Sequence, residues 1–104
     1  MIVEQRIYKL HPGKVPEFLR LYETTGLEVH RRILGNLIGY FSTATGKLNH
    51  VVHLWGFDSL EDRAQRRAEL VADPTWQACA ATLTPLLIEQ ESWILTPTSF
   101  SPLQ

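Results

Sequence analysis

Residues 50–67, HVVHLWGFDSLEDRAQRR, change from one periodicity to another halfway along. The first eight residues are rich in β-branched and aromatic side chains, which is typical of a buried strand. Asp58 or Ser59 then offers a helix N-cap, and Glu61 and Asp62 place negative charge in the first helical turn. The stretch therefore predicts a strand that leads directly into a helix, LEDRAQRRAELVA.

The residues before this stretch predict a strand, a long helix and a second strand. Residues 2–10 alternate between two faces, as a strand does, and HPG at 11–13 ends them as a turn. From residue 14 to about 33 the apolar spacing is helical, and TTG at 24–26 is a point where the helix kinks or breaks. A second strand is predicted over 37–44, joined by a hairpin connection to the strand at 50–57.

The residues after the stretch predict one more helix and one more strand. Asp73 is a helix N-cap and Pro74 occupies the first helical position, where its missing N–H is harmless. Pro85 ends this helix, and LIEQESWIL at 87–95 forms the last strand. The tail after residue 95 contains two prolines and is expected to be extended or irregular.

The predicted order of elements is β-α-β-β-α-β, which matches the ferredoxin-like α+β fold. We expect one domain over residues 1–104, with a four-stranded antiparallel sheet and helices on one of its faces. The other face carries an apolar set, for which we expect a two-fold homodimer that packs sheet against sheet; the alternative is a monomer with an unusually apolar exposed sheet. This set consists of Val3, Ile7, Phe41, Val52 and Leu54.

Composition excludes several kinds of protein. The formal net charge of −1, from 10 basic and 11 acidic residues, gives no electrostatic basis for binding nucleic acid or an anionic membrane. Cys79 is the only cysteine, so no internal disulfide and no multi-cysteine metal site is expected. The first ten residues lack the pattern of a secretory signal, and no apolar run approaches the roughly 20 residues of a membrane helix. We expect a cytoplasmic protein.

Four blocks of sequence carry a resemblance to a known family. They are VEQRIYKLHPGKVPEF (3–18), VVHLWGFDSLEDRAQRRAEL (51–70), DPTWQA (73–78) and PTSFSPL (97–103). In this order, and across almost the whole chain, they resemble the NIPSNAP family of the dimeric α/β-barrel proteins. The resemblance implies a dimeric barrel of ferredoxin-like subunits. It implies no settled activity, because the family is mostly described as uncharacterised.

The wider dimeric α/β-barrel class adds expectations about a pocket. The resemblance implies a pocket between the sheet and the helices of each subunit, as in cofactor-free monooxygenases, small-molecule isomerases and heme-degrading monooxygenases. Heme-degrading members use an asparagine on the first strand, a tryptophan on the third strand and a histidine on the next helix. The matching positions here are Arg6, Trp55 and Gln65. Because glutamine is a poor substitute for an imidazole ligand to iron, heme is disfavoured and no cofactor is expected.

The candidate catalytic residues are His53 and Arg6. His53 is predicted as a general base, and Arg6 as the group that holds an oxyanion. Tyr8 and Trp55 would shape the cavity as substrate-binding residues, since Arg6 and Tyr8 share one face of the first strand and His53 and Trp55 share one face of the third. The alternatives are structural: a satisfied core histidine, a tryptophan that anchors the core, and an Arg6 that pairs with Glu4, Glu89 or Glu91.

The helix after the third strand carries an arginine-rich face. Arg66 and Gln65 are predicted at the rim of the pocket as substrate-binding residues, whereas most of this face, Arg63 and Arg67 included, is expected to be solvated. Trp76 is expected to close the helical end of the core.

No metal site is expected. His50 and His53 point to opposite faces of their strand, and His30 lies late in the first predicted helix, where positive charge suits the helix end. Cys79 lies among small residues and is expected to be buried and inert.

Two functional hypotheses remain beside the family assignment with its unassigned biochemical function. One is a cofactor-free monooxygenase or isomerase that acts on an aromatic or anionic apolar metabolite. The other is a non-catalytic binding or assembly dimer. The enzyme requires a cavity of some hundreds of Å³, touched by Arg6, Tyr8 and Trp55.

Overall fold

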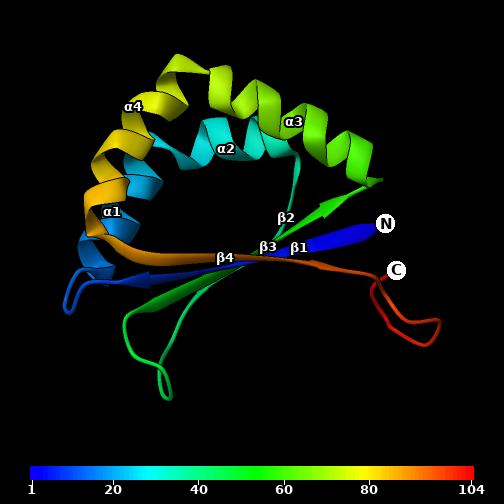
Figure 1. The fold of residues 1–104 in the computed structure, drawn as a ribbon, viewed down its shortest axis with the longest axis horizontal. Helices are drawn as coiled ribbons and strands as arrows, with labels where there is room; N and C mark the ends of the chain where they lie inside the picture. The colour runs from blue at the N-terminus through cyan, green and yellow to red at the C-terminus, as the bar shows by residue number, and fades with distance from the viewer.

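The computed structural model describes residues 1–104 and contains four strands and four α-helices (Figure 1). The prediction of a β-α-β-β-α-β order is confirmed. The helical region predicted over 14–33 is divided into two helices, and the two helices predicted after the third strand are both present. In chain order the elements are β1 (Ile2–Leu10), α1 (Val15–Thr25), α2 (Leu27–Leu34), β2 (Asn36–Ser42), β3 (His50–Phe57), α3 (Leu60–Ala72), α4 (Pro74–Leu83), a short 3-10 helix (Thr84–Leu86) and β4 (Leu87–Leu95).

The sheet is antiparallel throughout and has the strand order β2-β3-β1-β4. All four helices lie on one side of it, with α1 and α4 over one end and α2 and α3 over the other (Figure 1). This confirms the predicted ferredoxin-like fold. In the register of β1 and β3, Glu4 lies opposite Trp55 and Arg6 opposite His53, so these four residues share the helix-covered face.

A glycine separates α1 from α2 at the predicted break. Gly26 lies between Thr25 and Leu27, and a Cβ atom on it would lie 2.5 Å from Cys79 Sγ and 3.2 Å from Trp76 Cζ3. Both neighbours belong to α4. The absence of a side chain at Gly26 therefore lets the junction of α1 and α2 approach α4 closely.

Two side-chain caps begin the helices of the second half. Ser59 Oγ accepts a hydrogen bond from the backbone N–H of Asp62 at 3.0 Å, and the carboxylate of Asp73 accepts one from the N–H of Trp76 at 2.9 Å. The Asp73 cap and Pro74 at the first helical position are as predicted. The second strand is shorter than predicted and ends at Ser42.

The helix-covered core contains two apolar clusters. Leu10, Phe18, Tyr22, Val51, Cys79, Leu83 and Leu86 form one, and Val29, Ile33, Leu34, Trp55, Phe57 and Leu70 form the other. Three polar residues, Glu4, His30 and His53, are also buried on this side of the sheet. The buried polar groups of the molecule, and with them the candidate site, therefore lie on the helix-covered side. Cys79 is buried, as predicted.

No helix covers the opposite face of the sheet (Figure 1). Phe41 and Trp93 are 57% and 53% exposed, and Ile7, Val52 and Leu54 are partly exposed. Val3 differs from the expectation for this face, because it is buried. We refer to this surface as the open face. None of the helices has both the length and the apolar character that crossing a membrane requires.

Candidate functional site

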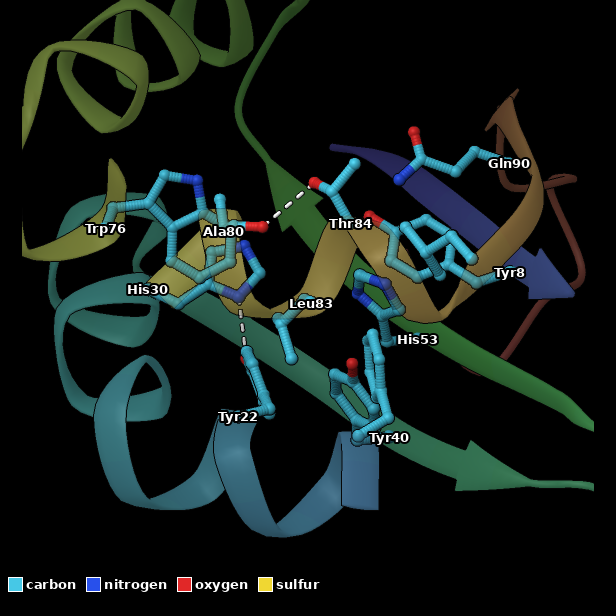
Figure 2. A pocket seen from close by; sticks show the side chains of 12 residues that line it. Tyr8, Tyr22, His30, Tyr40, His53, Trp76, Ala80, Leu83, Thr84 and Gln90 are labelled. Atoms are coloured by element: carbon cyan, nitrogen blue, oxygen red, sulfur yellow. Dashed lines mark hydrogen bonds between the residues drawn. The ribbon is translucent and has the colours of Figure 1, made fainter. Parts of the chain in front are cut away.

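The side chain of His53 lies at the centre of an aromatic cluster on the helix-covered side of the sheet (Figure 2). Its ring stacks on Tyr40, with centroids 4.5 Å apart and an interplanar angle of 13°. Tyr8 meets it edge-on at 4.9 Å. β3, β2 and β1 thus each contribute one ring, because Tyr40 and His53 are direct partners in the sheet and Tyr8 follows Arg6 by two residues.

The hydrogen bond from Trp55 determines where His53 carries its proton. The indole Nε1–H of Trp55 donates to His53 Nδ1 at 2.7 Å, and an indole has no acceptor role. A neutral His53 therefore carries its hydrogen on Nε2. Nε2 is buried and has no hydrogen-bond partner. The general-base role predicted for His53 does not fit this arrangement, because the acceptor nitrogen is already occupied and the free nitrogen is a donor.

His30, for which the sequence predicted only a place near a helix end, is a second buried imidazole beside the first. It is 3% exposed, its Nδ1 lies 2.6 Å from Tyr22 Oη, and its ring stacks on Trp76 at 4.3 Å. The centroids of His30 and His53 are 6.1 Å apart. The expected role of His30 as a positive charge at a helix end is wrong, because this ring is buried among aromatic side chains.

Burial lowers the pKa of both imidazoles. The pKa of His30 falls to about 2 and that of His53 to about 3, chiefly because an imidazolium would lose its hydration there. The positive charges of Arg6 and Arg67 lower both values further. Burial also raises the pKa of the phenols of Tyr22 and Tyr40. All four groups are therefore neutral near pH 7.

A cavity of about 60 Å³ opens between these rings and the helices α1, α2 and α4 (Figure 2). Its polar lining consists of phenol, imidazole, indole, hydroxyl and amide groups, without a carboxylate. The lining residues are Tyr8, Phe18, Tyr22, His30, Tyr40, His53, Trp76, Ala80, Leu83, Thr84, Leu87 and Gln90. Neither Arg6 nor Trp55 is among them, and the volume is smaller than the expected hundreds of Å³.

Two of the tyrosines form a wall between this cavity and a larger groove outside. Tyr22 and Tyr40 stack with centroids 4.9 Å apart. Both also line an outer groove of about 370 Å³ between α1, α2 and β2, together with Leu19, Arg20, Glu23, Leu27, Arg31 and Leu37.

Arg6 is held in an ion-pair network around Glu4. Its Nη1 donates to Glu4 Oε2 at 2.9 Å and its Nε donates to Tyr8 Oη at 2.8 Å. Arg63 donates to both oxygens of the same carboxylate, at 3.0 and 2.9 Å, and Ser92 Oγ donates to it at 2.5 Å. Burial alone would raise the pKa of Glu4, but these hydrogen bonds outweigh it and lower the pKa to about 2. The ion pair of Arg6 with Glu4 is one of the pairings predicted for Arg6 as the alternative to an oxyanion-binding role.

The other predicted binding residues lie apart from the cavity. Trp55 is fully buried behind His53 and reaches the site through its hydrogen bond. Arg66 Nε donates to Asp62 at 2.9 Å, and its Nη1 donates to the carbonyl of Ile33, at the end of α2. Gln65 is exposed on α3. Of the predicted site residues, His53 and Tyr8 meet in the cavity, Arg6 and Trp55 lie directly behind them, and Arg66 and Gln65 do not reach it.

Sequence reasoning predicted two of the twelve lining residues, Tyr8 and His53, and missed the other ten. Four of the ten carry polar rings that shape the site: Tyr22, His30, Tyr40 and Trp76. Two of these residues could have been found from the sequence. Trp76 lies in the first turn after the Asp73 cap, and Tyr40 must face the helices because its neighbour Phe41 faces the opposite side of the sheet.

These features define a ferredoxin-like domain with a small aromatic cavity between its sheet and its helices. The chain belongs to the NIPSNAP family, whose family model matches residues 3–102. Protein NipSnap of Drosophila melanogaster is 34% identical over 103 residues, which are 99% of this chain and 37% of that protein. The chain thus spans less than half the length of this curated relative. The biochemical function of the family is unassigned.

Solved structures agree with this assignment. A NIPSNAP family protein from Agrobacterium tumefaciens strain C58 is 50% identical and superposes with a TM-score of 0.96, over 99% of this chain and 98% of that chain. A putative antibiotic biosynthesis monooxygenase from Nitrosomonas europaea has a TM-score of 0.69 at 13% identity, over 93% of this chain and 98% of that chain. At this identity the second likeness shows the fold alone.

Proposed function

We propose that this protein is a small-molecule-binding domain whose cavity holds a flat, largely apolar ring bearing a hydrogen-bond acceptor such as a carbonyl oxygen. One observation carries the proposal: His53 Nε2–H is a buried donor without a partner, on a ring that lines the cavity. A buried donor without a partner costs about 1–3 kcal/mol. A bound acceptor oxygen would remove this cost, so the apo site is poised for such a ligand.

The rest of the lining suits the ring of the ligand. Tyr8, Phe18, Tyr40 and Trp76 present aromatic faces and edges, which favour flat partners. The volume of about 60 Å³ is far too small for a heme, and it is below the roughly 150 Å³ of a cavity that encloses benzene, so a bound ring would be only partly enclosed. Gln65, at the position where an iron-binding histidine would lie, is exposed on α3. The proposed function accordingly uses no cofactor.

The same lining favours binding over acid–base catalysis. An isomerase or a cofactor-free monooxygenase needs a group that accepts a proton from its substrate. The cavity offers no carboxylate, and its two imidazoles have pKa values of about 2 and 3, which make them weak bases near pH 7. A neutral imidazole N–H can still polarise a carbonyl, as a donor.

Nuclear magnetic resonance tests the donor directly. Long-range ¹H–¹⁵N spectra at pH 7 are expected to show His53 protonated on Nε2. Titration with acetophenone should shift the indole N–H signals of Trp55 and Trp76, whereas ethylbenzene, which lacks the carbonyl, should bind at least about tenfold more weakly. His53→Phe should abolish the difference between the two compounds, and Glu69→Gln, on the exposed side of α3, should keep it. A proton on Nδ1, or equal affinity for both compounds, would contradict the proposal.

We also propose that the protein forms a two-fold homodimer through the open face. Phe41 and Trp93 are more than half exposed there, and an apolar face of this kind is usually covered by a partner. Lys9 lies directly opposite Glu89 on the same face, so one copy offers both signs of charge to another. Light scattering should return about twice the chain mass of 11.9 kDa, and a mass near 11.9 kDa would contradict the dimer.

A further inference from the structure

We propose that Arg67 is an anion-binding residue at the edge of the cavity, and that the natural ligand carries a carboxylate beside its ring. This inference rests on the proposed function and deepens it, since it adds a charge to the class of ligand. Three observations on α3, β1 and β4 carry it.

The helical position of Arg67 directs its side chain toward the sheet. Arg63 and Leu70 lie on the same face of α3, four residues before and three residues after it. Arg63 reaches the sheet at Glu4, and Leu70 packs in the cluster that contains Trp55. Arg67 lies between these two contacts and is half-buried.

The charges around Arg67 do not balance. Arg6 and Arg63 both bind the carboxylate of Glu4, and three arginines therefore share one anion. Arg67 has no ion pair and no hydrogen bond within the chain, and burial together with Arg6 lowers its pKa. A partly desolvated guanidinium without a counter-charge is costly, and a carboxylate bound from outside would remove the cost.

Arg67 also lies near the proposed ligand, although it is not one of the residues that line the cavity. The turn of α3 that carries it lies between the contact of Arg63 with Glu4 and the packing of Leu70 beside Trp55, and Trp55 lies directly behind His53. In agreement with this placement, the charge of Arg67 contributes to the lowered pKa of both His30 and His53.

At the β4 side of the cavity, Gln90 is exposed and belongs to the lining, whereas the exposed Ser92 already donates its hydroxyl to Glu4. A ring in the cavity therefore has an open side at the amide of Gln90, from which its carboxylate would reach the free guanidinium of Arg67.

The number of free charges selects the class of anion. One unpaired guanidinium fits one carboxylate, which its planar fork binds through two parallel hydrogen bonds. A phosphate dianion would need a second free cation, and Arg6 and Arg63 are already engaged by Glu4.

The test compares the affinities of ligands that share one ring. They are acetophenone, 3-acetylbenzoate and 3-acetylbenzamide, and also 4-acetylbenzoate and 4-acetylbenzamide, which place the charged group at a second position. The wild-type protein should bind one of the acetylbenzoates at least about tenfold more tightly than the corresponding amide. Arg67→Gln should reduce this preference to about twofold or less, and Arg67→Lys should retain part of it. Lys47→Gln, a change at an exposed cation in the loop between β2 and β3, should keep the full preference and serves as the control.

A second measurement needs no ligand. Because the unpaired charge of Arg67 destabilises the fold without ligand, Arg67→Gln should raise Tm by a few degrees, whereas Lys47→Gln should leave Tm unchanged. A lower Tm for Arg67→Gln would show that Arg67 serves the fold, and would overturn the inference.

The outcomes separate the two proposals. If acetophenone binds and neither acetylbenzoate binds more tightly than its amide, or if Arg67→Gln keeps the preference, the anion site is overturned and the cavity proposal stands. If acetophenone and both acetylbenzoates fail to bind the wild-type protein, the cavity proposal is overturned and the anion site falls with it.

Discussion

His30 and His53 show how a residue's neighbours decide its chemistry. Both imidazoles lie among aromatic rings, and each uses Nδ1 in a hydrogen bond with a neighbouring side chain, Tyr22 Oη or the indole of Trp55. A histidine in water titrates near neutrality, whereas these two stay neutral far into the acid range because burial penalises their charged form.

Because both imidazoles stay neutral in the folded chain, the free energy of unfolding should fall as the pH is lowered. Below about pH 6.5 the unfolded chain binds a proton on each imidazole, but the folded chain does so only near pH 2 for His30 and pH 3 for His53. The unfolded state therefore gains protons that the folded state does not, and the free energy of unfolding falls as pH falls from 6.5 toward 3. From pH 7 to pH 5 the loss should be about 2 kcal/mol for each histidine.

Urea unfolding at pH 7 and pH 5, at fixed protein concentration, measures this loss. The folded carboxyl of Glu4 has a pKa of about 2 against an ordinary 4.5, so it adds its own loss only below about pH 4.5 and does not obscure the comparison. The fall should persist at high salt, because desolvation and not long-range charge causes it. Equal free energies of unfolding at the two pH values would contradict the prediction.

Glu4 is the residue whose replacement should cost most. Glu4→Gln leaves Arg6 and Arg63 half-buried without their shared counter-charge, and the free energy of unfolding should fall by about 3–5 kcal/mol. Chemical denaturation measures the change. Glu69→Gln, an exposed position on α3, is the matched control and should stay within about 0.5 kcal/mol of the wild type. A Glu4→Gln protein as stable as this control would show that the network contributes nothing.

At the scale of elements, the sequence was sufficient to predict the strands and the helix caps. It was not sufficient to predict which helical residues face the core. Read as one helix over 14–33, the chain places His30 near a charged helix end, beside Arg31 and Arg32. Gly26 instead separates two helices, and α2 buries its own face, formed by Val29, His30, Ile33 and Leu34. A local pattern cannot give the rotation of a new helix, because the packing against α3 and α4 sets it.

The ion pair of Arg63 could not be predicted from the local sequence, for a similar reason. Arg63 has acidic neighbours, Glu61 and Asp62, which predict a solvated face with local pairs. Its partner in the structure is Glu4, which lies 59 residues away in the sequence. Only the placement of α3 over β1 brings these groups together, and the same placement leaves Arg67 unpaired.

The close approach at Gly26 gives a prediction for the α1–α2 junction. Gly26→Ala places a methyl group 2.5 Å from Cys79 Sγ, and the resulting shift of α4 should lower the free energy of unfolding by about 1–3 kcal/mol. Cys79→Ala removes that sulfur, so the Gly26→Ala/Cys79→Ala double variant should lose less stability than the sum of the two single changes. Strictly additive losses in urea unfolding would show that the contact does not limit the packing.

At the scale of the whole molecule, the sheet has one covered and one open face. The covered face carries the cavity and the ion-pair network, and the open face carries Phe41 and Trp93. The proposed dimer therefore leaves the two cavities on the outer sides of the assembly, away from the contact between copies.

The dimer prediction is tested by a charge on the open face, at Trp93 of the edge strand β4. Trp93→Asp should bring the mass measured by light scattering from about twice 11.9 kDa to about 11.9 kDa, because each copy would place the buried charge opposite its partner. Phe100→Asp, at an 86% exposed residue of the tail, is the matched control and should leave the mass unchanged. A Trp93→Asp protein that remains dimeric would assign the contact to another surface.

The stacked pair of Tyr22 and Tyr40 has a consequence for rates. It separates a cavity of about 60 Å³ from an outer groove of about 370 Å³, and Tyr40 stands on an edge strand of the sheet. A ligand that extends from the cavity toward the outer groove must displace this side chain before it is fully seated. Discrimination by size should therefore be seen in the association rate constants of a ligand series, while the dissociation rate constants report the polar contacts.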